Sequence, residues 1–222
     1  FVGGGNMAEA MIGGLLASGW QASQITVVEP NSERQQYLQQ HFEIRALADS
    51  ATLPPVQALI LAVKPQILPN VARNLTVDAN TLVISIAAGI RCVDLQRWLG
   101  SVPLMRAMPN TPALIRQGIT GVFSTHQVNA QQQALGLSLL QAMGSVVEVA
   151  NEKDIDSVTA LSGSGPAYVF AFIEALEAGG VNLGLTAETA RQLAIQTVMG
   201  AAQMALQSPL PPSTLRQNVT SP

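Results

Sequence analysis

The sequence predicts an α/β fold with a doubly wound parallel sheet, followed by a small all-helical C-terminal domain. Three observations support this prediction. Short apolar runs alternate with amphipathic stretches as far as Ala150, a glycine cluster opens the first amphipathic stretch, and no strand pattern follows Ala150. We therefore expect two domains, residues 1–150 and residues 151–222.

The apolar runs are short and rich in Val, Ile and Leu, which is typical of parallel strands that helices cover on both faces. We expect strands at Ile25–Val28, Ala58–Val63, Leu82–Ile86, Val102–Met105, Gly121–Ser124 and Val146–Val149, after a strand end at Phe1-Val2. The helices between them are expected at Asn6–Ala17, Ser32–His41, Gln66–Asn74 and Ala130–Met143. This alternation implies right-handed βαβ units and a parallel sheet.

The remainder of the chain shows only helical patterns. We expect helices at Lys153–Leu161, Pro166–Gly179 and Ala187–Gln207, and a further helix that starts at Ser213. Thr186 is a good N-cap for the third of the four. The second domain is therefore expected to be all-helical.

Composition excludes several classes of protein. Apolar residues make up 48% and charged residues 11% of the chain, a balance typical of a globular protein and not of a disordered one. The formal charge of -3 and the scattered lysines and arginines predict no nucleic-acid partner. No apolar stretch approaches the roughly 20 residues that span a bilayer. The single cysteine, Cys92, fits a reducing compartment. We expect a cytoplasmic protein with no membrane partner and no metal site.

The glycine cluster has the form G-x-G-x-x-A, running from Gly3 through Gly5, Asn6 and Met7 to Ala8. It follows a strand end and opens a helix, which is the context of a Rossmann-type dinucleotide site. Gly3 permits the tight turn, and Gly5 lets the backbone approach a pyrophosphate. Ala8 lets the helix pack close to the sheet, and the helix N-terminus attracts phosphates. A plain glycine-rich turn is the alternative interpretation.

The second strand ends at Glu29, where an acidic residue is placed to bind a ribose 2′-hydroxyl and so favours NADH. Ser32 and Arg34 follow closely, and an arginine here can bind the 2′-phosphate of NADPH. The alternative is an ordinary helix start, with Ser32 as its cap. The choice between NADH and NADPH stays open.

Two more strand ends are expected at the ligand crevice, because ligands bind outside the carboxyl ends of parallel strands. One carries Ala62, Val63, Lys64 and Pro65, with Pro65 suited to the start of the next helix. The other ends in the small-residue turn Ala87-Ala88-Gly89, where a cofactor can approach the backbone. A solvated surface lysine is the alternative for Lys64.

Taken in order, these segments closely resemble the pyrroline-5-carboxylate reductase family. The matching stretches are FVGGGNMAEAMIGGL, LAVKPQ, VISIAAGI, RAMPNTPALIRQG, DSVTALSGSGPAYVF and LRQNVTSP. They cover nearly the whole chain, and their succession is much more specific than any one of them. The resemblance implies reduction of 1-pyrroline-5-carboxylate to L-proline by hydride transfer from NADPH or NADH, the last step of proline biosynthesis. It also implies a homodimer or larger homo-oligomer, with the active site between one nucleotide domain and the partner's helical domain.

The resemblance also assigns roles to residues. It implies that the pyrophosphate is held by Gly3, Gly5, Asn6, Met7 and Ala8, and that the segment from Glu29 to Arg34 meets the adenosine ribose. It places Lys64, Ala87 and Ala88 on the nicotinamide side. It places Glu152, Asn218, Thr220 and Ser221 at the substrate.

The sequence departs from the family pattern in two places. The family continues its Ser-Pro with Gly-Gly-x-Thr, so the expected catalytic Thr lies beyond Pro222 and no catalytic residue is assigned here. The family usually has an acidic residue where this chain has Pro209. We expect that a first half-strand and a C-terminal dimer-forming segment lie outside the given sequence.

The small number of residues that could donate a proton to a substrate agrees with an imine substrate. Reduction of a ketone needs a proton donor, typically His or Lys. The helical region holds only Lys153, and His41 and His126 lie in the nucleotide domain. An imine can enter already protonated, so its reduction demands mainly positioning. A β-hydroxyacid dehydrogenase is an alternative, but it needs a lysine that Ala187–Gln207 lacks. A non-catalytic nucleotide-sensing protein is a second alternative.

Overall fold

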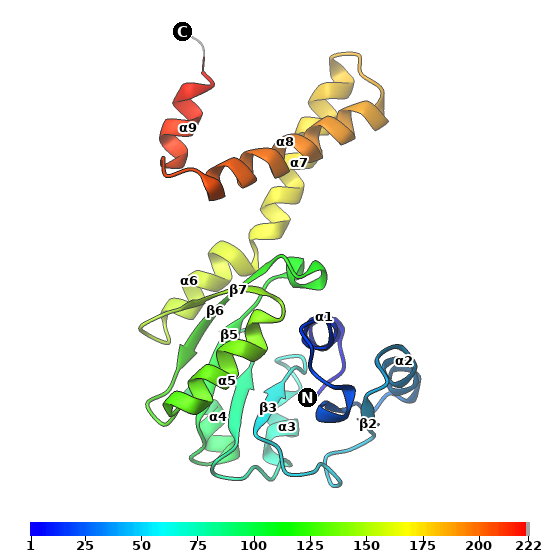
Figure 1. Ribbon diagram of the computed structural model, residues 1–222, viewed down its shortest axis with the longest axis vertical. Helices are drawn as coiled ribbons and strands as arrows, with labels where there is room; N and C mark the ends of the chain where they lie inside the picture. Colours follow the sequence, from blue (N-terminus) through cyan, green and yellow to red (C-terminus); the bar gives the residue numbers. More distant parts are fainter. Residues whose placement is uncertain (221–222) are drawn as a thin grey trace. The chain divides into compact units, whose positions relative to one another are not determined.

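The computed structural model describes residues 1–220, and the chain divides between Pro166 and Ala167 into two compact units (Figure 1). The last strand, β7 (Gly144–Glu148), ends close to residue 150, where the sequence predicts the domain boundary. The first unit nevertheless continues to Pro166, because α6 (Asp154–Val158) and the π-helical turn η3 (Thr159–Gly163) pack on the sheet.

Phe1-Val2 lies inside the sheet of the first unit, between β1 (Thr26–Val28) and β3 (Ala58–Leu61), which confirms the expected strand end. The amide of Val2 donates to the Ile60 carbonyl at 2.8 Å, and the amide of Val28 donates to the Phe1 carbonyl at 2.8 Å. Val2 thereby joins the pair β1 and β2 (Arg45–Leu47) to a five-stranded sheet. That sheet has the order β3, β4 (Leu82–Ser85), β5 (Leu104–Met108), β6 (Gly118–Ser124) and β7.

The prediction of a wholly parallel sheet is wrong at one junction. β6 runs antiparallel to β5, with Met108 opposite Gly121, whereas β7 is parallel to β6. The connection from β5 to β6 contains only the 3-10 helix η2 (Thr111–Ile115). A connection this short has no room for a crossover helix, so the chain returns in the opposite direction.

Helices cover both faces of the sheet, which confirms the doubly wound architecture (Figure 1). The helices are α1 (Asn6–Ala17), α2 (Ser32–Phe42), α3 (Leu68–Arg73), α4 (Cys92–Leu99) and α5 (Ala130–Gln141), with the 3-10 turn η1 at Ala22–Gln24. Alternate strand residues point to opposite faces. Ile60 therefore packs with α1, α2 and α5, while Leu59 and Leu61 pack with α3 and α4.

The second unit is all-helical and contains α7 (Gly165–Asn182) from Ala167 onward, α8 (Ala187–Gln207) and α9 (Pro212–Asn218). Thr186 caps α8 as expected, because its side chain accepts the Thr189 amide at 3.2 Å. The close contact between α7 and α8 depends on Gly180, where an added Cβ would lie 2.9 Å from Ala190 Cβ. Within residues 1–220, no helix combines the length and hydrophobicity that a membrane crossing requires.

Candidate nucleotide-binding site

The three glycines between Val2 and α1 differ in what surrounds them. Gly3 has a φ of +96°, and an added Cβ would lie 2.8 Å from Val63 Cγ1. An added Cβ at Gly4 would lie 2.6 Å from Leu38 Cδ1, whereas at Gly5 it would meet no atom within 4 Å. The fold therefore requires glycine at the first two positions. At Gly5, the N-cap of α1, the absent side chain leaves open space in front of the helix N-terminus.

This open space belongs to a groove of about 630 Å³, a volume within the usual range for a small-molecule site. The sequence-predicted residues that line it are Gly3, Gly5, Glu29, Ala62, Val63 and Lys64. The groove is also lined by residues that the sequence analysis missed: Gly4, Ala48, Asp49, Ser50, Ile67, Asn70, Val71 and Asn74. Residues 48–50 follow β2, a three-residue strand that was not predicted. Recognising that strand would have placed them at the crevice.

Glu29 fixes the glycine loop through its carboxylate. Its Oε2 accepts the Gly4 amide at 2.9 Å, and its Oε1 accepts the Asn31 amide at 3.0 Å. An ionised carboxylate has about four acceptor positions, so capacity remains for a ribose hydroxyl. Glu29 can therefore organise the loop and still serve as the expected ribose acceptor.

Arg34 is held by groups of the protein itself. Its Nε donates to the Gly4 carbonyl at 2.6 Å, its Nη2 forms an ion pair with Glu9, and its guanidinium lies 4.8 Å from the centre of the Tyr37 ring. The Tyr37 hydroxyl also donates to Glu9, at 2.8 Å. Burial opposes the charged form of Glu9, but the hydrogen bonds from Arg34 and Tyr37 outweigh it and lower the pKa of Glu9. Arg34 therefore lies beside the loop with its charge compensated.

The N-cap of α2 is not the residue that the sequence analysis considered, Ser32. Asn31, not Ser32, is the N-cap, since its side chain accepts the Arg34 amide at 2.8 Å. Ser32 is exposed in the first turn of α2. This leaves its hydroxyl available to solvent beside Arg34.

The remaining predicted cofactor residues occupy strand ends and the first turn of α1. Asn6 is exposed, Met7 is half-buried and Ala8 is fully buried in the helix–sheet contact. Pro65 precedes α3, which begins at Leu68, so its expected place at the start of the helix is wrong. Ala87 and Ala88 follow β4, with Ala87 buried and Ala88 exposed.

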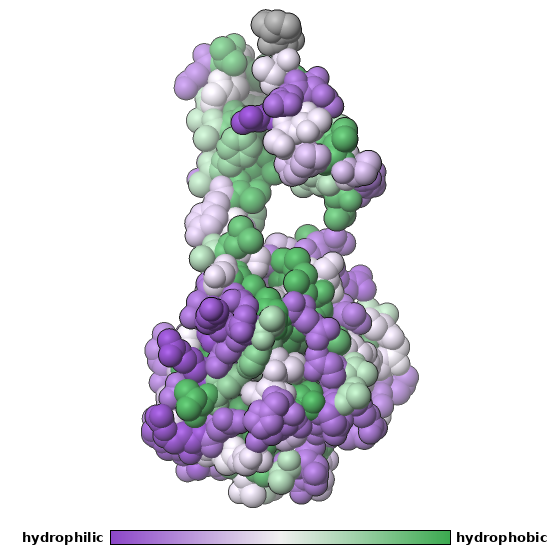
Figure 2. All heavy atoms as spheres, turned by 90° about the vertical axis from the view of Figure 1, so that its left-hand side faces the viewer, coloured by the Kyte–Doolittle hydropathy of each residue, from purple (hydrophilic) through white to green (hydrophobic). Residues whose placement is uncertain are grey.

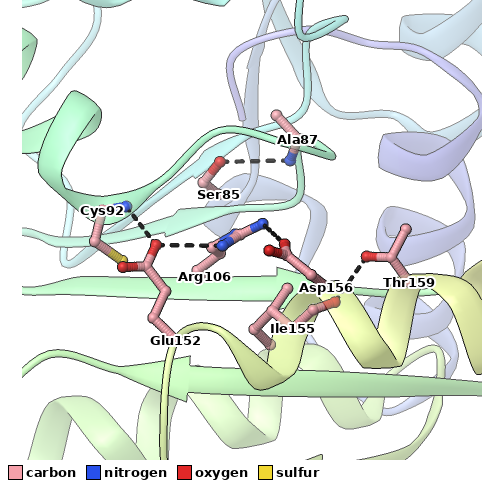
Figure 3. A network of polar contacts seen from close by, with 8 residues as sticks. All are labelled: Ser85, Ala87, Cys92, Arg106, Glu152, Ile155, Asp156 and Thr159. Carbon is pink, nitrogen blue, oxygen red and sulfur yellow. Dashed lines mark hydrogen bonds and ion pairs between the residues drawn. The ribbon is translucent and has the colours of Figure 1, made fainter.

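Glu152 belongs to a network around the buried Arg106 of β5, whose side chain is 3% exposed (Figure 3). Arg106 Nη1 lies 3.3 Å from Glu152 Oε1, and its Nη2 lies 2.9 Å from Asp156 Oδ1. Glu152 Oε1 also accepts the amide of Cys92, the first residue of α4, at 2.7 Å. Burial, and secondarily the Glu152 charge, raises the pKa of the Cys92 thiol to about 12.

The other residues expected at the substrate lie in the second unit. Asn218 is the last residue of α9 and is exposed. The Thr220 hydroxyl donates to the Arg216 carbonyl at 2.9 Å. Ser221 lies outside the described residues.

Comparison with known proteins decides the family. A family model described as pyrroline-5-carboxylate reductase dimerisation matches residues 152–222. The pyrroline-5-carboxylate reductase of Pseudomonas aeruginosa is 44% identical, and the match covers 100% of this chain and 83% of that protein. The Synechocystis enzyme is 42% identical, over 100% of this chain and 84% of that protein. The chain belongs to the pyrroline-5-carboxylate reductase family.

Solved structures of this family agree. A pyrroline-5-carboxylate reductase from Coxiella burnetii has a TM-score of 0.94 at 39% identity, over 100% of this chain and 84% of that one. The Plasmodium falciparum enzyme, solved with NADP bound, has a TM-score of 0.88 at 30% identity, over 100% of this chain and 83% of that one. A model described as NADP oxidoreductase coenzyme F420-dependent matches residues 1–89, and these findings support NAD(P)H as the cofactor.

More distant structures share only the fold. A reductive aminase from Aspergillus terreus has a TM-score of 0.67 at 15% identity. The prephenate dehydrogenase of Aquifex aeolicus has a TM-score of 0.63 at 15% identity. Both confirm the α/β architecture with its helical second part, and neither bears on the substrate.

Proposed function

We propose that this chain reduces 1-pyrroline-5-carboxylate to L-proline with NAD(P)H, the last step of proline biosynthesis. Family membership over the whole chain supports the substrate. The observation that carries the cofactor half of the proposal is the open space at Gly5, between the glycine loop and the strand ends of the groove. When bound, NAD(P)H supplies the hydride that reduces the C=N carbon.

The protein's own part is to bind and orient. The free amides at the start of α1, with the positive end of the helix dipole, would hold the pyrophosphate beside Gly3 and Gly5. Glu29 would accept a ribose hydroxyl. Lys64, with Ala62 and Val63, would line the path towards the nicotinamide. The proposed cofactor set is completed by Asn6, Met7, Ala8, Ser32, Arg34, Pro65, Ala87 and Ala88.

The packing of His41 fits a substrate that needs no proton donor from this residue. The His41 ring stacks on Tyr37, at 5.3 Å between centroids, and meets the edge of Phe42 at 4.7 Å. His41 therefore has a packing role on α2. A protonated imine becomes a neutral amine on hydride addition, so positioning is the main requirement.

We propose that the active form is a homo-oligomer. In the second unit the buried hydrophobic residues are only Ala190 and Ala194, among those the structure describes. Large apolar side chains of this unit are more than half exposed, among them Tyr168, Phe170, Phe172, Leu193, Met199 and Met204. Figure 2 shows hydrophobic surface over the helical unit. Surface of this kind marks an association site, and the matching family model is described as a dimerisation model.

The test is isotopic. The protein at its natural length is incubated with 1-pyrroline-5-carboxylate and NAD(P)H deuterated at the transferred position. We expect L-proline with one deuterium on the carbon of the former C=N bond, because the hydride is delivered there. Proline without deuterium, or no proline, would refute the proposal. A β-hydroxyacid dehydrogenase would instead oxidise a 3-hydroxy acid, and a nucleotide-sensing protein would bind the cofactor without turnover.

A further inference from the structure

The Arg106 network connects the segment before α6, which contains Glu152, to the proposed nicotinamide side of the site. Glu152 precedes α6, Arg106 lies on β5, and Cys92 opens α4 (Figure 3). Cys92 is also the residue at which the loop after β4 ends, and this loop contains Ala87 and Ala88. One carboxylate therefore joins the segment before α6 to the end of the loop that is proposed to lie on the nicotinamide side.

From this geometry we infer that Glu152 is a positioning residue. It acts on the loop of residues 86–91 through the Cys92 amide, and does not bind the substrate. The inference rests on the proposed function for its kinetic consequences. It replaces the substrate contact that the resemblance implies for Glu152 with a contact inside the protein.

The contacts of Glu152 support this role. Its Oε1 accepts from both the Cys92 amide at 2.7 Å and Arg106 Nη1 at 3.3 Å. The first amides of a helix have no partner within the helix, so the Glu152 carboxylate satisfies one of them and complements the helix dipole. A carboxylate so engaged is poorly suited to receive a substrate that itself carries a carboxylate, because like charges repel.

Arg106 explains why the carboxylate stays in place. Its guanidinium is buried, and a buried charge needs an anionic partner held close to it. Arg106 also binds Asp156, which lies on α6 shortly after Glu152, at 2.9 Å. Asp156 differs from Glu152 in its contacts: within residues 1–220 its side chain makes a polar contact only with Arg106 and forms no hydrogen bond to the loop of residues 86–91 or to α4.

This difference provides a matched control. Glu152→Ala removes the acceptor for the Cys92 amide, whereas Glu152→Gln keeps an acceptor oxygen without the charge. Asp156→Ala is the control, because it removes the other anionic partner of Arg106 and leaves the Cys92 contact in place. We expect Glu152→Ala to lower kcat about tenfold with KM for 1-pyrroline-5-carboxylate changed less than about twofold, because orientation and not binding is lost. Glu152→Gln should recover most of kcat, and Asp156→Ala should stay near the wild-type value.

A structural readout separates this inference from the proposed function. Hydrogen–deuterium exchange of the segment 86–95 should rise in Glu152→Ala and stay near the wild-type rate in Glu152→Gln and Asp156→Ala, whether or not the protein turns over the imine. The inference is overturned if both Glu152 variants raise KM and leave kcat and exchange unchanged, which would show a substrate contact. It is also overturned if Glu152→Ala and Asp156→Ala behave alike. An inactive wild-type protein with the expected exchange pattern would count against the proposed function alone.

Discussion

Gly5 is the residue at which cofactor binding can be changed with least effect on folding. Its missing side chain faces open space, unlike those of Gly3 and Gly4. We expect Gly5→Val to abolish NAD(P)H binding in a folded protein, because the branched side chain occupies the position where the backbone must approach the pyrophosphate. Calorimetric titration measures this directly.

A control at the neighbouring turn sharpens the test. Gly3→Val should lower stability as well as binding, since it combines a φ of +96° with contact to Val63. Unchanged NAD(P)H affinity in folded Gly5→Val would show that the groove is not the cofactor site.

The ion pair of Arg34 with Glu9 provides a test of how the proposed site responds to a 2′-phosphate. If Arg34 binds that phosphate, Arg34→Ala should weaken NADPH much more than NADH, by roughly 1.5–3 kcal/mol, or about tenfold or more. Glu9→Gln should act in the opposite direction and strengthen NADPH, because it removes the carboxylate that now compensates Arg34. Affinities of both variants for both cofactors provide the measurement. Equal losses for the two cofactors in Arg34→Ala would leave Glu29 as the determinant and point to NADH.

Much of the groove could be predicted at the residue scale, because the glycine loop and the strand ends follow from local sequence and a general rule of α/β sheets. Six of the predicted residues meet in one groove: Gly3, Gly5, Glu29, Ala62, Val63 and Lys64. Glu9 could not be predicted as a partner of Arg34, because the contact joins two helices that are 25 residues apart in the chain. The roles of Asn218, Thr220 and Ser221 remain predictions.

At the scale of elements, the packing of α1 depends on one of two adjacent glycines. An added Cβ at Gly14 would lie 2.1 Å from the Ala142 carbonyl oxygen, whereas at Gly13 it would lie 3.5 Å from Phe42 Cε1, an ordinary contact. We expect Gly14→Ala to lower the free energy of unfolding by about 1–3 kcal/mol or more, because the helix must move away from α5. Gly13→Ala should change it by less than about 1 kcal/mol, towards greater stability, since alanine favours a helix. Urea unfolding would compare the two, and equal midpoints would contradict the packing.

The elements themselves were predictable where a pattern is local. Asn6–Ala17 and Ala187–Gln207 have the predicted bounds, because caps and apolar spacing define both helices. The antiparallel direction of β6 was missed, since an apolar run does not encode strand direction. The short connection through η2 was the available signal. β2 is only three residues long and exposes Arg45, so its apolar pattern is too weak to detect.

For the whole molecule, the apolar surface of the second unit predicts association. Sedimentation should show a homodimer or larger assembly, because so few hydrophobic residues of this unit are buried within the chain. A stable monomer at micromolar concentration would contradict this. The number of subunits could not be predicted from the sequence, since it depends on interface geometry and not on apolar content alone.

The most direct test of the central claim is a steady-state assay of the natural-length protein with 1-pyrroline-5-carboxylate, run separately with NADH and NADPH. The account predicts that cofactor oxidation depends on the imine, that one L-proline forms for each cofactor oxidised, and that Gly5→Val abolishes the reaction. Absence of imine-dependent turnover with both cofactors, in a folded protein that binds NAD(P)H, would contradict it.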